Sequence, residues 1–423
     1  MEKNEIKDLF SSCIQNHSNL VYLTELIAEA KSRYDTTSFP SRKEEHWKNT
    51  EIGALFSEKY VLAEKLDLQW IPENLAFPDI LDAYKLVFVN GHYAENLSDS
   101  LENTGVAIQT GSNIDHQILK ELYERENIAY FPLLNDCASD ALVHIQIQEN
   151  KVVEKPILVY NLFQATQATM ICPKICYSIG SNSQAKIVLT YDNISKQDGK
   201  VFYNSVQKIK VLENAQLEII SLINDLGQNL YFNSFHAEQK KDSTLSCLSF
   251  NLSTKFVRNE LQIDLLAENC ECNLYGLNTP QNEQIIDNYT FIRHQSPYCQ
   301  SNELYKSIVG EKSNSVFLGR IFVAPHAPKT LAFQQNSNLL LSSNGKVSSK
   351  PQLEIFTDDV KCSHGSSTGQ IDSNALFYMR SRGIDMQQAK NLLISAFAAE
   401  VVSKISLTDL KDYIAELTNK VLN

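Results

Sequence analysis

A cysteine and a histidine separated by one residue, Cys362 and His364, are the side chains in this sequence most suited to chemistry. If this segment is an extended strand, both side chains point to the same face, because successive side chains of a strand alternate between its faces. A thiolate beside an imidazole can bind a soft or borderline metal ion, or act as a nucleophile with its base. Gly365 follows directly, and its lack of a side chain lets a backbone or a ligand approach closely.

Two ligands do not complete a metal site. A structural zinc ion takes about four ligands, and an iron–sulfur cluster takes about four cysteine-type ligands. A metal at Cys362 and His364 would therefore need further ligands from elsewhere in the chain or from another subunit. The other interpretations are a buried thiol beside a hydrogen-bonded histidine, or a hydrolase in which Asp358 or Asp359 orients His364. No nucleophile elbow accompanies the pair.

Two other cysteine pairs are weaker candidates for a metal site. Cys172 and Cys176 would lie about 13 Å apart on one face of a strand, which is too far for one metal unless Pro173 bends the chain. Cys270 and Cys272 would face the same side at ligand distance, although the alternation around them is typical of an ordinary core.

Three histidines outside the pair are further candidates. His294 and His326 are predicted at turns, where each would be an interface ligand or, more commonly, a surface or hydrogen-bonded histidine. His46, beside Trp47, is predicted to pack. The sequence contains no G-x4-G-K-[ST] loop, no G-x-G-x-x-G after a strand, no H-E-x-x-H and no G-x-S-x-G, so it lacks the signatures of several nucleotide-binding and hydrolytic classes.

Composition indicates a globular protein of a reducing compartment. The 423 residues carry a net charge of -12, which argues against binding nucleic acid through a basic surface. No apolar run of about 18 residues predicts a membrane span, and the first residues lack the apolar core of a secretory signal. Nine cysteines without regular spacing fit persistent thiols, so we expect a cytoplasmic location.

The predicted helices and strands divide the chain into three domains. Residues 1–140 are expected to form a mainly helical N-terminal domain, with helical periodicity over 2–34. Residues 141–371 show alternation without helical periodicity, as in Leu261-Gln-Ile263-Asp-Leu265, and predict a β domain that is a sandwich, a barrel or a solenoid. Polar turns favour the solenoid. Residues 372–423 predict three helices.

Those three helices have recognisable starts. Asp372 or Ser373 is expected to cap the first, Asp385 the second, and Ser406 the third. They would cover the open end of the β domain or present a face to a partner.

The chain resembles the SufD family of iron–sulfur cluster assembly scaffolds, most strongly from about residue 255 to 405. Where the family usually carries Thr-Asp-Ala or Thr-Asp-Gly before Gln, this chain has Thr330-Leu-Ala-Phe-Gln. The related SufB family is usually longer, with more cysteines. The matching pieces follow the family's order: Pro40-Ser-Arg-Lys-Glu44 with Trp47, Asp287, His294, Phe317-x-Gly319-Arg-Ile321, Pro351-x-Leu-Glu-Ile355, Asp358-Asp-Val-Lys-Cys362-Ser-His364-Gly365 and Ser381-Arg-Gly383.

The resemblance implies a right-handed parallel β-helix between N- and C-terminal helical domains. It implies a non-catalytic scaffold that pairs with a SufB-like paralogue and docks a SufC-like ABC-type ATPase on its C-terminal helices. It also implies that His364 lies at the SufB-like interface and helps hold iron or a nascent cluster with a cysteine of that partner, while Cys362 assists or only packs. Whether iron, sulfide or a whole cluster binds, and whether a flavin takes part, is left open.

Two alternatives belong to other functional classes. A carbohydrate-active β-helix enzyme, a lyase or a hydrolase, would place carboxylates and bases on one outer face, although such enzymes are usually exported. A structural dimer would leave Cys362 and His364 inert. A long exposed solenoid edge would also favour a homodimer when the chain is alone.

Overall fold

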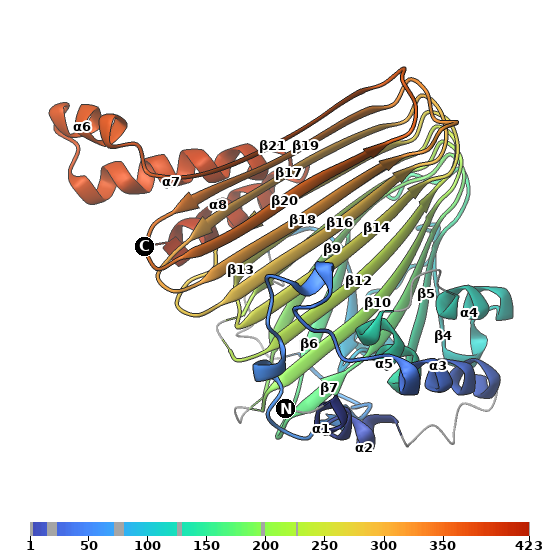
Figure 1. Ribbon diagram of the computed structural model, residues 1–423. Coiled ribbons are helices and arrows are strands. Elements are labelled where there is room, and N and C mark those ends of the chain that lie inside the picture. Colours follow the sequence, from blue (N-terminus) through green and yellow to red (C-terminus); the bar gives the residue numbers. More distant parts are fainter. Residues whose placement is uncertain are drawn as a thin grey trace.

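A parallel β-helix forms the centre of the computed structural model, which describes residues 3–14, 23–71, 80–124, 129–195, 199–225 and 227–422 (Figure 1). Through most of the helix, successive strands alternate between two sheets, so each turn adds one strand to each sheet. Neighbouring strands of these turns pair in parallel and in register. The parallel β-helix implied by the family resemblance is thereby confirmed.

Among the described residues, one sheet has eleven strands and the other has ten. The eleven-stranded sheet contains β1 (Val61–Leu62), β4 (Val106–Thr110), β5 (Ala141–Ile147), β7 (Thr169–Ile171), β8 (Pro173–Ile179), β10 (Val201–Val211), β12 (Leu230–Gln239), β14 (Phe256–Leu265), β16 (Ile285–His294), β18 (Asn314–Val323) and β20 (Lys346–Ile355). The ten-stranded sheet contains β2 (Tyr84–Val89), β3 (His92–Tyr93), β6 (Ile157–Phe163), β9 (Gln184–Asn193), β11 (Gln216–Asn224), β13 (Thr244–Ser253), β15 (Glu271–Asn278), β17 (Gln300–Val309), β19 (Leu331–Leu340) and β21 (Lys361–Gln370).

Alternation along the strands places one set of side chains between the sheets. In β14 the predicted alternation holds, and Leu261, Ile263 and Leu265 enter the main apolar core. Fully burying such a side chain contributes roughly 1.5–3 kcal/mol, so repeated inward positions stabilise the stack of turns.

Asparagines stabilise one line of turns between the sheets. Asn150, Asn182 and Asn214 all adopt left-handed backbone conformations, with φ of 57°, 57° and 54°. Their side-chain amides form a ladder, because Asn182 donates to Asn150 at 3.0 Å and Asn214 donates to Asn182 at 2.9 Å. Asparagine tolerates this conformation better than most residues do, which explains the asparagine-rich turns of the sequence.

The N-terminal helices lie beside the early strands, at the end of the β-helix opposite β20 and β21 (Figure 1). Residues 15–22 of the predicted 2–34 helix lie outside the described residues. The helices before residue 140 are α1 (Lys3–Asp8), α2 (Ser11–Ile14), α3 (Thr24–Thr36), α4 (His116–Tyr123) and α5 (Tyr130–Ala138).

The segment that resembles the family's N-terminal signature packs on the outer face of the eleven-stranded sheet. Trp47 lies 4.1 Å from the guanidinium carbon of the fully buried Arg258. Arg258 pairs with Asp287 at 2.6 Å, and Asp287 also accepts a hydrogen bond from Thr50. His46 stacks near Tyr289, which agrees with its predicted packing role. Asp287 therefore anchors this segment to β16.

Three C-terminal helices follow the last strand, as predicted: α6 (Ser373–Ser381), α7 (Met386–Val402) and α8 (Thr408–Leu422). Asp372 and Asp385 cap α6 and α7 through their carboxylates. Ser406 instead donates its hydroxyl to Glu218, so the predicted cap of α8 is wrong. Helices α7 and α8 pack on the ten-stranded sheet, whereas α6 projects away from the body (Figure 1).

The last turn of the β-helix is open. Strands β20 and β21 end the two sheets, and every residue along both is at least partly exposed. The open edges leave backbone N–H and C=O groups available to another chain.

Candidate functional site

His364 lies on this open last turn. It belongs to β21 and stands in register with Gln334 of β19, whose side chain points between the sheets. The imidazole is exposed because no further turn covers it. Within the described part of the chain, His364 makes no hydrogen bond or ion pair. A neutral imidazole in this position can bind a metal without displacing a structural contact.

Cys362 shares the inward face of β21, as the spacing predicts, but its surroundings differ. Its thiol is half-buried beside a small apolar cluster that includes Ile321 and Ala332. Burial raises the pKa of the Cys362 thiol above its usual value, partly offset by a hydrogen bond from the Ala332 backbone. The thiol is therefore protonated at neutral pH and is a poorer ligand than His364 in the isolated chain.

The space around Cys362 and His364 is open. A β-carbon added at Gly365 or Gly369 would meet no atom within 4 Å. A groove of about 820 Å³ runs between the outer face of the ten-stranded sheet and the end of α7, and it reaches His364 at the last strand. Phe333, which is 42% exposed, and Lys404 contribute to its lining. A second macromolecule can therefore approach His364 without moving this chain.

Two buried polar residues lie at the positions that match His364 on the two preceding strands of its sheet, and the sequence did not predict them. Leu274, Glu303, Gln334 and His364 occupy matching positions on β15, β17, β19 and β21. Glu303 and Gln334 are each 3% exposed, and the Gln334 amide donates to the Glu303 carboxylate. Thr290 donates to the same carboxylate at 3.3 Å. The inward column thus changes from apolar to polar as it approaches the open turn.

Burial dominates the titration of Glu303. It raises the pKa of the carboxyl from 4.5 to about 7, although the hydrogen bonds from Gln334 and Thr290 oppose the shift. One Glu303 oxygen has no partner in the described structure. The sequence signal is a glutamate at an inward position of a strand, which is recognisable only once the register is known.

Cys270 does not join Cys272 in a site. Both residues border the main core, but Cys272 makes no hydrogen bond in the described structure, whereas Cys270 lies at the corner before β15 and stacks on Cys299, one turn later. The sulfur atoms of both corner thiols lie 3.1 Å from the Ala267 carbonyl oxygen. A hydrogen bond from Cys299 lowers the pKa of the Cys270 thiol to about 7. Ser243, on the turn before, makes the equivalent corner bond to the carbonyl of Lys240.

The Cys172 and Cys176 thiols also lie apart. Cys172 packs in the aromatic cluster below the N-terminal segment, and Cys176 packs beneath α4. Burial raises the pKa of both thiols, that of Cys176 to about 11. They do not form a metal site together.

The histidine at 294 is not at an interface. His294 ends β16 fully buried, where it contacts the Ser301 hydroxyl at 2.9 Å. Burial lowers its pKa to about 3, so the imidazole is neutral. The predicted turn position is wrong for His294, because the chain turns only after this side chain has entered the core, whereas the hydrogen-bonded alternative is confirmed. His326 does lie in an exposed turn.

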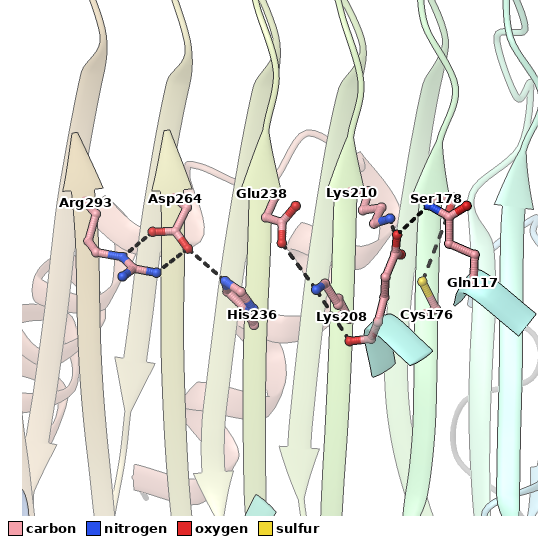
Figure 2. A network of polar contacts seen from close by, with 10 residues as sticks. Gln117, Cys176, Ser178, Lys208, Lys210, His236, Glu238, Asp264 and Arg293 are labelled. Carbon is pink, nitrogen blue, oxygen red and sulfur yellow. Dashed lines mark hydrogen bonds and ion pairs between the residues drawn. The ribbon is translucent and has the colours of Figure 1, made fainter. Parts of the chain in front are cut away.

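The outer face of the eleven-stranded sheet carries a ladder of charged side chains from β10 to β16 (Figure 2). Asp264 contacts both Arg293, at 2.6 Å, and His236, at 2.8 Å. Glu238 pairs with Lys208 at 3.2 Å, and Lys210 pairs with a glutamate of α4. Each carboxylate in the ladder has a cationic partner. This pairing argues against the outer-face acid and base of the carbohydrate-enzyme alternative.

Metal-ligand geometry agrees with an incomplete site. Among the described residues, no three His, Cys, Asp or Glu side chains are grouped to hold a metal ion. Cys362 and His364 therefore keep the ligand shortfall that their sequence implies. In the same part of the chain, no helix is long and apolar enough to cross a membrane.

Comparisons with known proteins cover nearly the whole chain. Residues 162–397 match the family model described as "SUF system FeS cluster assembly, SufBD core domain", and residues 2–159 match the SufBD protein N-terminal region. The chain is 32% identical to the iron–sulfur cluster assembly protein SufD of Escherichia coli, over 89% of this chain and 88% of that protein. A SufBD family iron–sulfur cluster assembly protein of Synechocystis is 30% identical, over 88% and 85% of the two chains.

The corner position of Cys270 predicts that a hydroxyl can replace its thiol. Cys270→Ser should change the free energy of unfolding by less than about 1 kcal/mol, because Ser243 makes the same corner bond. Cys272→Ser is the matched control and should cost about 1–3 kcal/mol, because its hydroxyl would enter an apolar core. Urea denaturation of both variants measures the difference, and equal losses would contradict the corner role.

The raised pKa of Glu303 predicts a pH-dependent contribution to stability. The folded protein holds this proton more tightly than the unfolded chain does, so the stabilisation is present below pH 4.5 and is lost as pH rises toward about 7. Glu303→Gln should therefore gain stability relative to the parent chain, by up to ~3 kcal/mol between these pH values. Urea unfolding at pH values from 5 to 8 measures the free energy of unfolding of the parent and of Glu303→Gln, with the exposed Glu283→Gln as control. A difference between Glu303→Gln and the parent that does not change with pH would refute the prediction.

Proposed function

The chain belongs to the SufBD family of the SUF iron–sulfur cluster assembly system, and from this membership we propose that it is a scaffold subunit on which clusters are assembled. In this proposal His364 supplies one ligand to the iron or to the nascent cluster, which are the cargo of the complex. The observation that carries it is the exposed, unpartnered imidazole on the open last turn.

The remaining ligands would come from a SufB-like paralogue. A parallel β-helix of the same family can offer its own last turn to the open edges of β20 and β21, because strand edges pair through backbone hydrogen bonds. Such pairing would bring a cysteine of the partner to His364. When the chain is alone, the same edges would favour a homodimer.

Within this shared site the two residues of the pair have different roles. His364 is free to bind, because no contact holds it elsewhere. Cys362 must first lose the proton that burial retains, so it joins the ligand set only when a metal displaces that proton. Its contacts with the apolar cluster around Ile321 support a packing role until then.

A SufC-like ABC-type ATPase would dock on the C-terminal helices. Helix α6 buries none of its residues, and Phe377 and Tyr378 on it are 76% and 60% exposed. Met386 and Leu392 are further exposed apolar residues, on α7. Exposed aromatic residues of this kind mark protein interfaces. ATP hydrolysis would then take place in the partner, and this chain would transmit the resulting movement through α7 to the ten-stranded sheet.

Loss of the imidazole should stop cluster assembly without unfolding the chain. In a complex with the paralogue and the ATPase, His364→Ala is expected to lower cluster yield by more than about ten-fold, since even a second-shell partner of a metal ligand is worth ten- to a hundred-fold in metal affinity or activity. Absorption of the reconstituted cluster gives the yield, and His326→Ala, another exposed histidine, is the control. An undiminished yield from His364→Ala would refute the ligand role.

The exposed aromatic pair on α6 predicts where the ATPase binds. The double variant Phe377→Ser and Tyr378→Ser should weaken co-purification of the ATPase by at least ten-fold while the paralogue still binds, because both side chains are exposed and removal leaves no cavity. Tyr298→Ser removes another aromatic residue, 58% exposed, in the turn between β16 and β17, and serves as the control. Equal ATPase recovery with the double variant and with the control would locate the dock elsewhere.

A further inference from the structure

The buried Gln334 stands between a carboxylate and the proposed iron ligand. Gln334 lies on β19, which pairs with β17 on one side and with β21 on the other. The residue paired with Gln334 is Glu303 on β17 and His364 on β21. Adjacent strands lie about 4.8 Å apart, so side chains at matching inward positions are within reach of one another. The three residues therefore form one column that ends at the open turn.

The hydrogen bonds of Gln334 give its amide a direction. Its Nε2 atom donates to Glu303, and its Oε1 atom has no partner among the described residues although the side chain is 97% buried. When Glu303 is ionised, above its raised pKa, its carboxylate can only accept hydrogen bonds, so it favours the amide nitrogen on its own side. The free amide oxygen is a buried acceptor without a donor, and such acceptors are rare in native proteins.

His364 carries a donor within reach of this oxygen, although the structure contains no hydrogen bond between the two side chains. It is the next inward residue of the column, it makes no hydrogen bond or ion pair in the described structure, and its ring always carries an N–H on at least one nitrogen. A histidine that binds a metal through one nitrogen usually donates its other N–H to an oxygen acceptor, which fixes the tautomer and the ring orientation.

We propose that Gln334, held by Glu303, is a positioning residue that accepts the ring N–H of His364 and so aims the opposite ring nitrogen at the metal. The inference rests on the proposed function, because it assigns a partner to the ligand proposed there. Glu303 acts only through Gln334 in this arrangement: it orients the amide and does not itself reach the metal.

The column also explains why a polar pair is buried at the end of an otherwise apolar core. Burying an amide and a carboxyl without full hydrogen bonding costs free energy, and a leucine at either position would avoid that cost. The preceding inward position, Leu274, has such an apolar residue. A role toward His364 accounts for the polar residues at 303 and 334.

The test uses the complex of the full chain with its paralogue and ATPase, titrated with Fe²⁺ under anaerobic conditions. Gln334→Met keeps the length of the side chain but removes the acceptor. Gln335→Met makes the same change one residue later, on the outer face of the same strand, and is the matched control. We expect Gln334→Met to weaken Fe²⁺ binding about ten- to a hundred-fold, and Gln335→Met to leave it unchanged.

A spectroscopic readout separates positioning from general damage. With Cu²⁺ as the probe and His364→Ala as the blank, pulsed electron paramagnetic resonance detects the remote nitrogen of a bound imidazole. The quadrupole coupling of that nitrogen should shift in Gln334→Met, because its N–H loses its acceptor, while the melting temperature of the complex stays within a few degrees of the parent.

The outcomes distinguish the two proposals. Weaker Fe²⁺ binding together with a shifted nitrogen signal supports the positioning role. If His364→Ala abolishes Fe²⁺ binding but Gln334→Met binds normally with an unchanged signal, the positioning role is overturned and the proposed function stands. If His364→Ala itself binds Fe²⁺ like the parent complex, both are overturned.

Discussion

In-register backbone pairing is the constraint on which this structure depends. Each strand of the β-helix satisfies its N–H and C=O groups with the strand one turn before and the strand one turn after, and asparagine ladders repeat this stacking at the turns. Backbone pairing of this kind does not itself limit the number of turns, because each end strand can pair with a further strand. At its N-terminal end the stack passes into the antiparallel strands β3 and β4, whereas at β20 and β21 the pairing simply ends.

That ending determines where chemistry can occur. A histidine at an inward position of an interior turn would be buried and neutral, as His294 is. His364 has the same inward direction but lies on the last turn, so it faces both the polar interior and the solvent. The open strand edge and the exposed imidazole therefore coincide, which is the arrangement that the proposed site shared between two subunits requires.

Local patterns in the sequence predicted much of this architecture. Alternation located β14, the acidic caps located α6 and α7, and the two-residue spacing placed Cys362 and His364 on one face of a strand. The family resemblance, rather than periodicity, selected the β-helix over a sandwich or a barrel.

What escaped prediction depends on the register between turns. Cys270 meets Cys299, and Glu303 meets Gln334, only because residues a full turn apart in sequence stack on one another. Turn lengths vary, so local spacing pairs Cys270 with its neighbour Cys272 instead. Burial of His294 likewise follows from strand pairing, since nothing nearby in the sequence distinguishes an inward histidine from one at a turn.

The central claim is that the last turn is completed by a paralogous subunit at His364. Amide hydrogen exchange of β20 and β21, measured for the chain alone at a concentration too low for self-pairing and again with the SufB-like paralogue, tests it most directly. The account predicts fast exchange at both edges in the free chain and strong protection of the segment around His364 in the complex, with β9 and β10 unchanged. Exchange at β20 and β21 that stays fast when the paralogue is bound would contradict it.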